Sequence, residues 1–242
     1  MNGSEIDKHE VENIIAEFLS GRNILLNAVE KVIHYYKLLE SWNNRVNLIS
    51  LHGWTKFLKE HILDSISILK CDLIKGNEYL CDIGSGGGLP VVPVKIFSPE
   101  LNLVMTESIS KKANALIDMV CELKLKSVEV LNERVEYLGA REEWRKKFDM
   151  ATVRALGKTE EALEYAMPLL KIGGHCVLYK TETENIGTAA LEVLGGDLVD
   201  MYDYKIEGLK KRRRLIVIRK RIETPKRFPR KVGIARKRPI VL

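Results

Sequence analysis

The fold is decided by the stretch Tyr79-Leu80-Cys81-Asp82-Ile83-Gly84-Ser85-Gly86-Gly87-Gly88-Leu89-Pro90. Its first five residues form a short apolar run of the kind found in buried parallel strands, and the run leads directly into glycines. Pro90 then stands near the first turn of a helix expected at 91–97. The stretch therefore predicts a strand, a glycine loop and a helix of a βαβ unit.

The spacing of the glycines indicates a cofactor without a pyrophosphate. A dinucleotide fingerprint has glycine at its first, third and sixth positions, and the sixth position counted from Gly84 is Leu89. The spacing here is G-x-G-x-G, through Gly84, Gly86 and Gly88. Glycines at these positions let the backbone turn tightly and lie against a ligand. A purely structural tight turn is the alternative interpretation.

An acidic residue completes the pattern of a nucleoside-binding site. Glu107 follows the apolar run 101–105, so it is expected at the carboxyl end of the next strand. In doubly wound sheets that edge holds the ligand, and a carboxylate there can accept both ribose hydroxyls. With Asp82 before the loop and Glu107 after it, the sequence predicts a site for S-adenosylmethionine. Residues 132–136 would then lie beside the adenine, although an ordinary loop has the same sequence features.

The rest of the chain alternates between apolar runs and amphipathic segments. Helical periodicity predicts three helices ahead of the glycine loop, at 5–19, 25–42 and 54–69. Further helices are expected at 110–123 and 160–170, the latter ended by glycines at 173–174. Strands are expected at 79–83, 101–105, 128–131, 148–153, 175–179, 198–206 and 215–218. This order indicates an α/β fold, a parallel sheet with an antiparallel edge hairpin.

Two further places stand out as candidate site residues. Arg154 follows the fourth strand at the edge where ligands bind, although an arginine there can equally be a surface salt-bridge partner. His61 and Asp64 lie three residues apart on one predicted helix face, a spacing that permits a hydrogen bond. A structural pair and a role in shaping the cofactor pocket are both consistent with that spacing.

Charge is distributed unevenly along the chain. The net charge is +6, yet 15 of the 39 Lys and Arg residues lie at 210–242 against one acid, Glu223. The body is therefore acidic and the last segment basic. A solvated charge run is one explanation, but this density, on a segment that its prolines are expected to keep extended, favours a polyanionic partner. Nucleic acid is the first candidate and an anionic membrane surface the second.

Length and composition set the limits of this interpretation. The 242 residues, 45% of them hydrophobic, suit one main domain with an appendage. No apolar stretch approaches membrane-spanning length and the N-terminus is polar, so we expect a cytoplasmic protein. The four cysteines lack C-x-x-C spacing, which indicates neither a metal site nor a disulfide framework.

Several groups of residues also match one known family. They are Trp42-Asn43, Asn47-Leu48, His61-x-x-Asp64-Ser65, 82–90, Glu107-Ser108, Lys111-Lys112, Arg134-Val135-Glu136, Arg154-Ala155, Leu169-Leu170-Lys171, Gly173-Gly174, 225–230 and Gly233. Together they make the chain resemble the small-subunit ribosomal RNA guanine-N7 methyltransferases, the family long called glucose-inhibited division protein B. The glycine loop is common to many methyltransferases, whereas the H-x-x-D-S helix and the P-K-R-F-P-R-K-x-G tail are more specific.

The resemblance implies a seven-stranded, Rossmann-like S-adenosylmethionine-dependent methyltransferase fold. It divides the chain into an N-terminal helical extension at 1–75, a methyltransferase domain at 76–222 and a basic tail at 223–242. It implies that the cofactor contacts Gly84, Leu89, Val135, Glu136 and Arg154, with Glu107 on the ribose; the loop glycines Gly86 and Gly88 complete the set. Three positions depart from the family pattern, namely Val91, Glu107 and Thr181.

The implied activity is methylation of N7 of a guanine in 16S ribosomal RNA. Guanine N7 carries a lone pair and no proton, so it can attack the methyl group without a general base, and we assign no catalytic residue. The expected partner is 16S rRNA, in the small ribosomal subunit or an assembly intermediate, and the protein is expected to be monomeric. Two alternatives are a non-catalytic RNA-binding or ribosome assembly protein on this fold, and a small-molecule methyltransferase. The intact glycine loop argues against the former and the basic tail against the latter.

Overall fold

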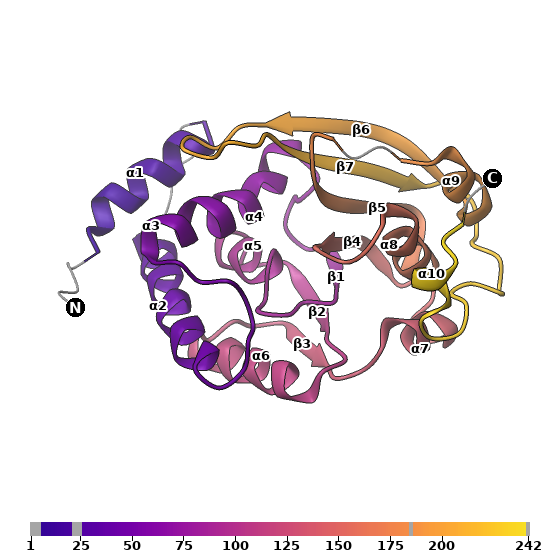
Figure 1. Cartoon of the computed structure of the whole chain (residues 1–242), viewed down its shortest axis with the longest axis horizontal. Helices are drawn as coiled ribbons and strands as arrows, with labels where there is room; N and C mark the ends of the chain where they lie inside the picture. Colours follow the sequence, from indigo (N-terminus) through magenta and orange to yellow (C-terminus); the bar gives the residue numbers. More distant parts are fainter. Residues whose placement is uncertain (1–5, 21–25, 184–185, 241–242) are drawn as a thin grey trace.

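The computed structural model describes residues 6–20, 26–183 and 186–240 and contains a central seven-stranded sheet (Figure 1). The strand order is β3-β2-β1-β4-β5-β7-β6, and within the described residues β7 runs opposite to the other six strands. The strands are β1 (Tyr79–Ile83), β2 (Asn102–Thr106), β3 (Val128–Leu131), β4 (Phe148–Arg154), β5 (Leu170–Thr181), β6 (Gly196–Tyr204) and β7 (Arg213–Lys220). The predicted parallel sheet with an antiparallel edge hairpin is confirmed.

Helices cover both faces of this sheet. In chain order they are α1 (Lys8–Phe18), α2 (Leu26–Asn43), α3 (Trp54–Phe57), the π-helix η1 (Leu58–Leu63), α4 (Asp64–Ile66), the 3₁₀-helix η2 (Ser67–Cys71), α5 (Val91–Phe97), α6 (Ser110–Glu122), α7 (Val135–Ala140), α8 (Thr159–Ala166), the 3₁₀-helix η3 (Met167–Leu169), α9 (Thr188–Leu194) and α10 (Ile234–Lys237). No helix in the described ranges is long and apolar enough to cross a membrane.

Alternation along the strands divides the core into two apolar clusters. Successive strand residues point to opposite faces, so Leu80 belongs to one cluster and Cys81 to the other. The first cluster joins the sheet to the N-terminal helices and to α5 and α6, and the second joins it to α7, α8 and α9. Because helices cover both faces of the sheet, the central strands appear in the sequence as continuous apolar runs.

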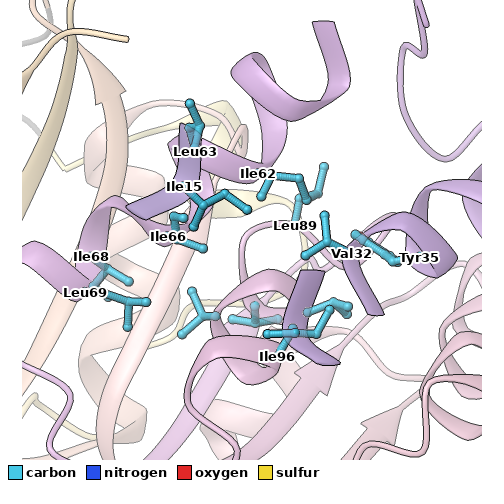
Figure 2. Packing of buried hydrophobic residues seen from close by; sticks show 14 of the residues in the cluster. Ile15, Val32, Tyr35, Ile62, Leu63, Ile66, Ile68, Leu69, Leu89 and Ile96 are labelled. Atoms are coloured by element: carbon cyan, nitrogen blue, oxygen red, sulfur yellow. The ribbon is translucent and has the colours of Figure 1, made fainter. Parts of the chain in front are cut away.

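The N-terminal helices share the first of these clusters with the glycine loop. Figure 2 shows Val32 and Tyr35 of α2 close to Leu89, at the end of the loop, with Ile62 from η1 beside them. The Tyr35 hydroxyl also donates a hydrogen bond of 2.6 Å to the Gly87 carbonyl oxygen. The helical extension therefore supports the loop directly.

Three local expectations were wrong. Residues 170–174 belong to β5, where the register with β4 shifts between Phe148 and Met150. Gly173 has a φ of +87°, and a Cβ on Gly174 would lie 2.9 Å from the Asp149 carbonyl oxygen. The glycines therefore form an irregularity within a strand and do not end a helix. The helix α7 was not expected from the sequence. The helix expected at 54–69 contains π and 3₁₀ turns.

The basic C-terminal segment folds against the body and is not extended. Phe228 and Ala235 are buried in the second cluster, and α10 packs against α8. Figure 1 shows α10, in yellow, beside α8 and near α7. The prolines in this segment therefore shape a compact turn structure, because apolar side chains between the basic residues give it a face to bury.

Candidate cofactor and substrate site

The glycine loop lies at the carboxyl end of β1, where its conformation requires glycine. Gly84, Gly86 and Gly88 have φ values of +71°, +55° and +94°, a region that other residues rarely adopt. At Gly88 a Cβ would lie 2.7 Å from Val92 Cγ2 and 3.1 Å from the Tyr35 hydroxyl oxygen, so this position is also sterically closed. At Gly84 the near atom is Leu156 Cδ1, at 2.8 Å, the end of a flexible side chain. At Gly86 the nearest atom is the Gly84 carbonyl oxygen at 3.9 Å, which leaves open space there.

Glu107 stands directly after β2, as predicted, and its carboxylate joins the two strand ends. Its Oε2 accepts a hydrogen bond of 3.0 Å from the Gly86 amide, and its Oε1 accepts one of 2.8 Å from the Ile109 amide. Thr106 adds to this junction, because its hydroxyl donates to the Asp82 carbonyl oxygen and accepts from the Gly84 amide. A charged carboxylate is thereby held beside the glycine loop.

A pocket of about 770 Å³ opens at this edge of the sheet. Of the predicted site residues, Gly84, Val135 and Glu136 line it, and Glu107 lies between the lining residues Thr106 and Ser108. The other lining residues are Ile83, Glu133, Arg134, Ala155, Leu156, Gly157, Glu161, Tyr165, Gly233, Arg236 and Lys237. The pocket therefore brings together the ends of β1, β2, β3 and β4, helices α7 and α8, and the C-terminal segment.

Gly86, Gly88, Leu89 and Arg154 are not among the lining residues. Leu89 is buried and packs into the first apolar cluster. Within the folded chain, Leu89 holds the glycine loop against the N-terminal helices.

Arg154 binds the N-terminal helical section. Its Nη2 lies 2.9 Å from Asp64 Oδ2, donates to the Glu60 carbonyl oxygen at 2.9 Å, and lies 3.4 Å from His61 Nδ1. The sequence spacing had permitted a direct hydrogen bond between His61 and Asp64. Instead, both contact Arg154 and are thus linked through it. The π-helix η1 makes this arrangement, since its wider turn changes which side chains share a face.

Asp64 is the buried centre of a larger polar network. Its Oδ1 accepts a hydrogen bond of 2.9 Å from the Tyr204 hydroxyl, and Arg213 Nε lies 3.7 Å away, too far for a hydrogen bond. Burial, followed by the Arg154 charge, lowers the pKa of His61. Neutral His61 is therefore favoured beside the Arg154 guanidinium.

Asp82 is a buried carboxyl group at the end of β1 whose ionisation the sequence did not reveal. Its Oδ1 accepts a hydrogen bond of 2.7 Å from Thr152, while Oδ2 has no partner among the described residues. Burial raises the pKa of Asp82 to about 7, against opposing contributions from hydrogen bonds and from Arg154. An acid at the end of an apolar strand, directly before the glycine loop, was the available signal.

The C-terminal contribution to the pocket was also not anticipated. Gly233, Arg236 and Lys237 line it, and the Gly233 amide donates a hydrogen bond of 3.1 Å to Glu136 Oε1. The basic composition of this segment signalled a polyanionic partner but gave no information on its position. Among the described residues, no group of three His, Cys, Asp or Glu side chains is arranged to hold a metal ion.

The donor set suits S-adenosylmethionine. The glycines let backbone amides approach a ligand closely, Glu107 can accept hydrogen bonds from ribose hydroxyls, and Val135 and Glu136 form the far wall. The loop offers no third glycine at the spacing that a pyrophosphate requires.

Comparison with known proteins places these features in a family. A family model described as rRNA small subunit methyltransferase G matches residues 28–202. A protein from Clostridium novyi (strain NT) named ribosomal RNA small subunit methyltransferase G is 32% identical over 249 aligned positions, covering 100% of each chain. A protein of that name from Rubrobacter xylanophilus is 39% identical over 216 positions, covering 86% of this chain and 83% of its own.

Solved structures show the same fold at low sequence identity. A SAM-dependent methyltransferase from Aquifex aeolicus superposes with a TM-score of 0.52 at 16% identity, covering 76% of this chain and 97% of that one. A mutant of MtNAS in complex with S-adenosylmethionine superposes with a TM-score of 0.55 at 14% identity, covering 90% of this chain and 85% of its own. Both likenesses concern the fold alone.

Proposed function

The chain belongs to the rRNA small subunit methyltransferase G family, and from this premise we propose that it transfers a methyl group from S-adenosylmethionine to N7 of a guanine in 16S ribosomal RNA. The observation that carries the proposal is the glycine loop bonded to Glu107 beside the pocket at the carboxyl edge of the sheet. We further propose a monomeric cytoplasmic enzyme that acts on the small subunit or an assembly intermediate.

The cofactor is proposed to lie across the ends of β1 and β2. Gly84, Gly86, Gly88 and Leu89 would shape the loop against its methionine part. Glu107 would accept the ribose hydroxyls, and Val135 and Glu136 would enclose the adenine. Of these residues, Gly84, Val135 and Glu136 already line the pocket.

Arg154 is proposed to contact the cofactor through the guanidinium atoms that the helical section leaves unused. Its Nη2 makes the contacts to Asp64, Glu60 and His61 described above, whereas Nε and Nη1 take no part in them. We propose that these two atoms face the cofactor carboxylate. In this proposal the extension at 1–75 positions a residue of the methyltransferase domain at 76–222, and the tail at 223–242 completes the pocket.

The proposed reaction needs little acid–base catalysis from protein side chains. The cofactor supplies an electrophilic methyl group on a sulfonium, and guanine N7 offers a lone pair without a proton to remove. The protein residues therefore act by holding the two reactants in line and by excluding water. They also have to tolerate the positive charge that moves onto the purine. Glu133, Glu136 and Glu161, which line the pocket, supply negative charge for that purpose.

Nucleoside mapping by mass spectrometry tests the proposed reaction. Small-subunit rRNA from cells with the protein is expected to contain an N7-methylguanosine that rRNA from cells without it lacks. Purified protein, S-adenosylmethionine and the unmethylated subunit should then restore that nucleoside. An unchanged nucleoside profile would support the non-catalytic assembly role, and a different modified position would overturn the N7 assignment.

A further inference from the structure

The C-terminal strap, defined here as residues 228–237, is built into the fold. Pro229 packs against α7, where a Cβ on Gly139 would come within 2.9 Å of Pro229 Cγ. Arg145 donates to the Phe228 carbonyl oxygen at 2.6 Å and to the Thr224 carbonyl oxygen at 2.8 Å. Several independent contacts therefore fix where the strap begins.

A buried ion pair fixes its middle. Glu164 of α8 has a side chain with no exposed surface, and its Oε1 accepts hydrogen bonds from the Arg230 amide at 2.8 Å and from Arg230 Nε at 3.0 Å. Arg230 Nη2 bonds the other oxygen at 2.5 Å. Such a two-pronged guanidinium–carboxylate contact fixes direction as well as distance. Three residues later, the Gly233 amide bonds Glu136 in the pocket wall.

These anchors place Arg236 and Lys237 at the pocket. Both line it, both side chains are exposed, and neither forms an ion pair with any residue in the described part of the chain. Lys226, just before the strap, differs because its side chain is 91% exposed and lies 3.4 Å from Glu142, away from the pocket. The basic segment therefore contains two kinds of positive charge. Arg236 and Lys237 line the pocket, and Lys226 lies outside it.

The charges of the pocket give these two cations a role. Its lining includes three carboxylates, Glu133, Glu136 and Glu161, of which Glu133 is ion-paired with Arg141. Glu136 and Glu161 form no ion pair among the described residues and repel a phosphate backbone. Of its three Arg and Lys residues, Arg134 belongs to the body, and Arg236 and Lys237 come from the strap. An RNA strand that presents a base to this pocket needs a cation at its entrance for the adjoining phosphate.

We propose that Arg236 and Lys237 bind phosphate of the substrate RNA strand at the entrance of the pocket, on the strap that Arg230 and Glu164 anchor. This inference rests on the proposed function and deepens it. It makes the strap part of the substrate site, whereas a diffuse basic tail would act through its net charge alone.

Two double variants that remove equal charge separate these alternatives. In R236A/K237A both pocket cations are lost, and in K226A/R238A two exposed cations outside the pocket lining are lost from the same segment. Binding of unmethylated small-subunit RNA is measured from about 50 to about 200 mM salt. Loss of two contacts should reduce the salt slope by about 1.4, so that the wild-type affinity falls about sevenfold more than that of R236A/K237A over this range. The salt slope of K226A/R238A should stay close to that of the wild type.

Calorimetric titration with S-adenosylmethionine completes the test. R236A/K237A should lose cofactor affinity by a smaller factor than RNA affinity, and the charge-retaining variant R236K/K237R should recover RNA binding. Equal losses of RNA affinity in both alanine pairs would overturn the proposal in favour of diffuse charge. Loss of cofactor binding with unchanged RNA binding would instead assign the two cations to the cofactor.

RNA binding is measured without turnover, so failure of this inference and failure of the proposed function are distinguishable. If nucleoside mapping fails while the two pairs differ, the reaction assignment falls and the phosphate contact stands. If mapping succeeds while the two pairs behave alike, only the role of the strap is withdrawn.

Discussion

At the scale of single residues, the three loop glycines have different physical reasons to be glycine. Gly88 is closed by Val92, Tyr35 and Leu116, so any side chain there disturbs packing, whereas a side chain at Gly84 would displace the end of Leu156. Gly86 has open space around its missing Cβ, and only its φ of +55° restricts it. A substitution at Gly86 therefore reports on the ligand more than on the protein core.

Gly86→Asp is expected to abolish measurable calorimetric binding of S-adenosylmethionine while the protein remains folded. Asp tolerates the left-handed region better than most residues, and its charge would occupy the space proposed for the methionine part. Gly173→Asp is the matched control, because Gly173 also has positive φ, at +87°, and nothing within 4 Å. Equal cofactor affinity in the two variants would show that the loop is only structural.

Asp82 makes stability depend on pH with a defined sign. Its pKa is raised from the ordinary value of 3.8 to about 7 by burial. Its contribution to folding is therefore fully present below about pH 4 and is lost as the pH rises through about 7. Asn does not titrate, so Asp82→Asn should become more stable relative to the wild type by up to about 4 kcal/mol between about pH 4 and about pH 8.

Chemical denaturation at several pH values checks this prediction. Asp203→Asn is a control of opposite sign, since hydrogen bonds from Arg214 lower the pKa of Asp203. Its wild-type residue stabilises the protein above the ordinary Asp pKa, and the difference should shrink as the pH falls. A stability difference for Asp82→Asn that does not change with pH would contradict the raised pKa.

At the scale of elements, the π-helix η1 and its neighbour α4 connect the N-terminal extension to the sheet. Asp64 at the start of α4 bonds Arg154 at the end of β4 and Tyr204 at the end of β6. These contacts join parts of the chain that lie 90 and 140 positions from Asp64. The extension is thus fixed to the sheet by a buried charge in addition to apolar packing.

Asp64→Asn should destabilise the protein by about 3–5 kcal/mol, because it leaves the largely buried Arg154 charge, whose side chain is 15% exposed, without its partner. The matched control is Asp197→Asn, which breaks the more exposed pair with Arg221 and should cost no more than about 1 kcal/mol. Urea unfolding of both variants measures the difference. Equal losses would show that the Asp64 network adds nothing beyond a surface pair.

At the scale of the whole molecule, the reaction itself is expected to need no general base. Removing a true general base lowers a rate by about 10²–10⁴-fold. The single-turnover rate of Asp82→Asn, measured with saturating cofactor and RNA, should instead fall by less than about tenfold. A larger fall, together with the loss of a rate increase near the Asp82 pKa of about 7, would identify Asp82 as a base and contradict N7 as the acceptor.

The sheet could be predicted because its central strands are buried on both faces and appear as apolar runs. The strand ends in turn located Gly84, Glu107, Val135 and Glu136 at the correct edge. What could not be predicted depends on partners distant in sequence. Arg154 points to a carboxylate 90 positions earlier, and no local pattern records that choice.

The same limit explains the errors in the C-terminal half. Gly173 and Gly174 permit a helix end or a strand irregularity equally well, and pairing with β4 decides between them. The strap belongs to the segment 210–242, which is rich in basic residues and contains prolines, so its composition suggested an extended segment. Its fold depends on Glu164, which lies 66 positions before Arg230 and is fully buried.

The strap also has a consequence for how the protein is made. It follows every other pocket-lining residue in the sequence, so translation produces it after all of them. Domains fold from their N-terminal parts during synthesis, so β1 to β5 can begin to fold before the strap emerges from the ribosome. A nascent chain stalled before Phe228 would have the glycine loop but lack the wall formed by Gly233, Arg236 and Lys237. The pocket is therefore completed only after the residues of the glycine loop and of the parallel strands have been synthesised.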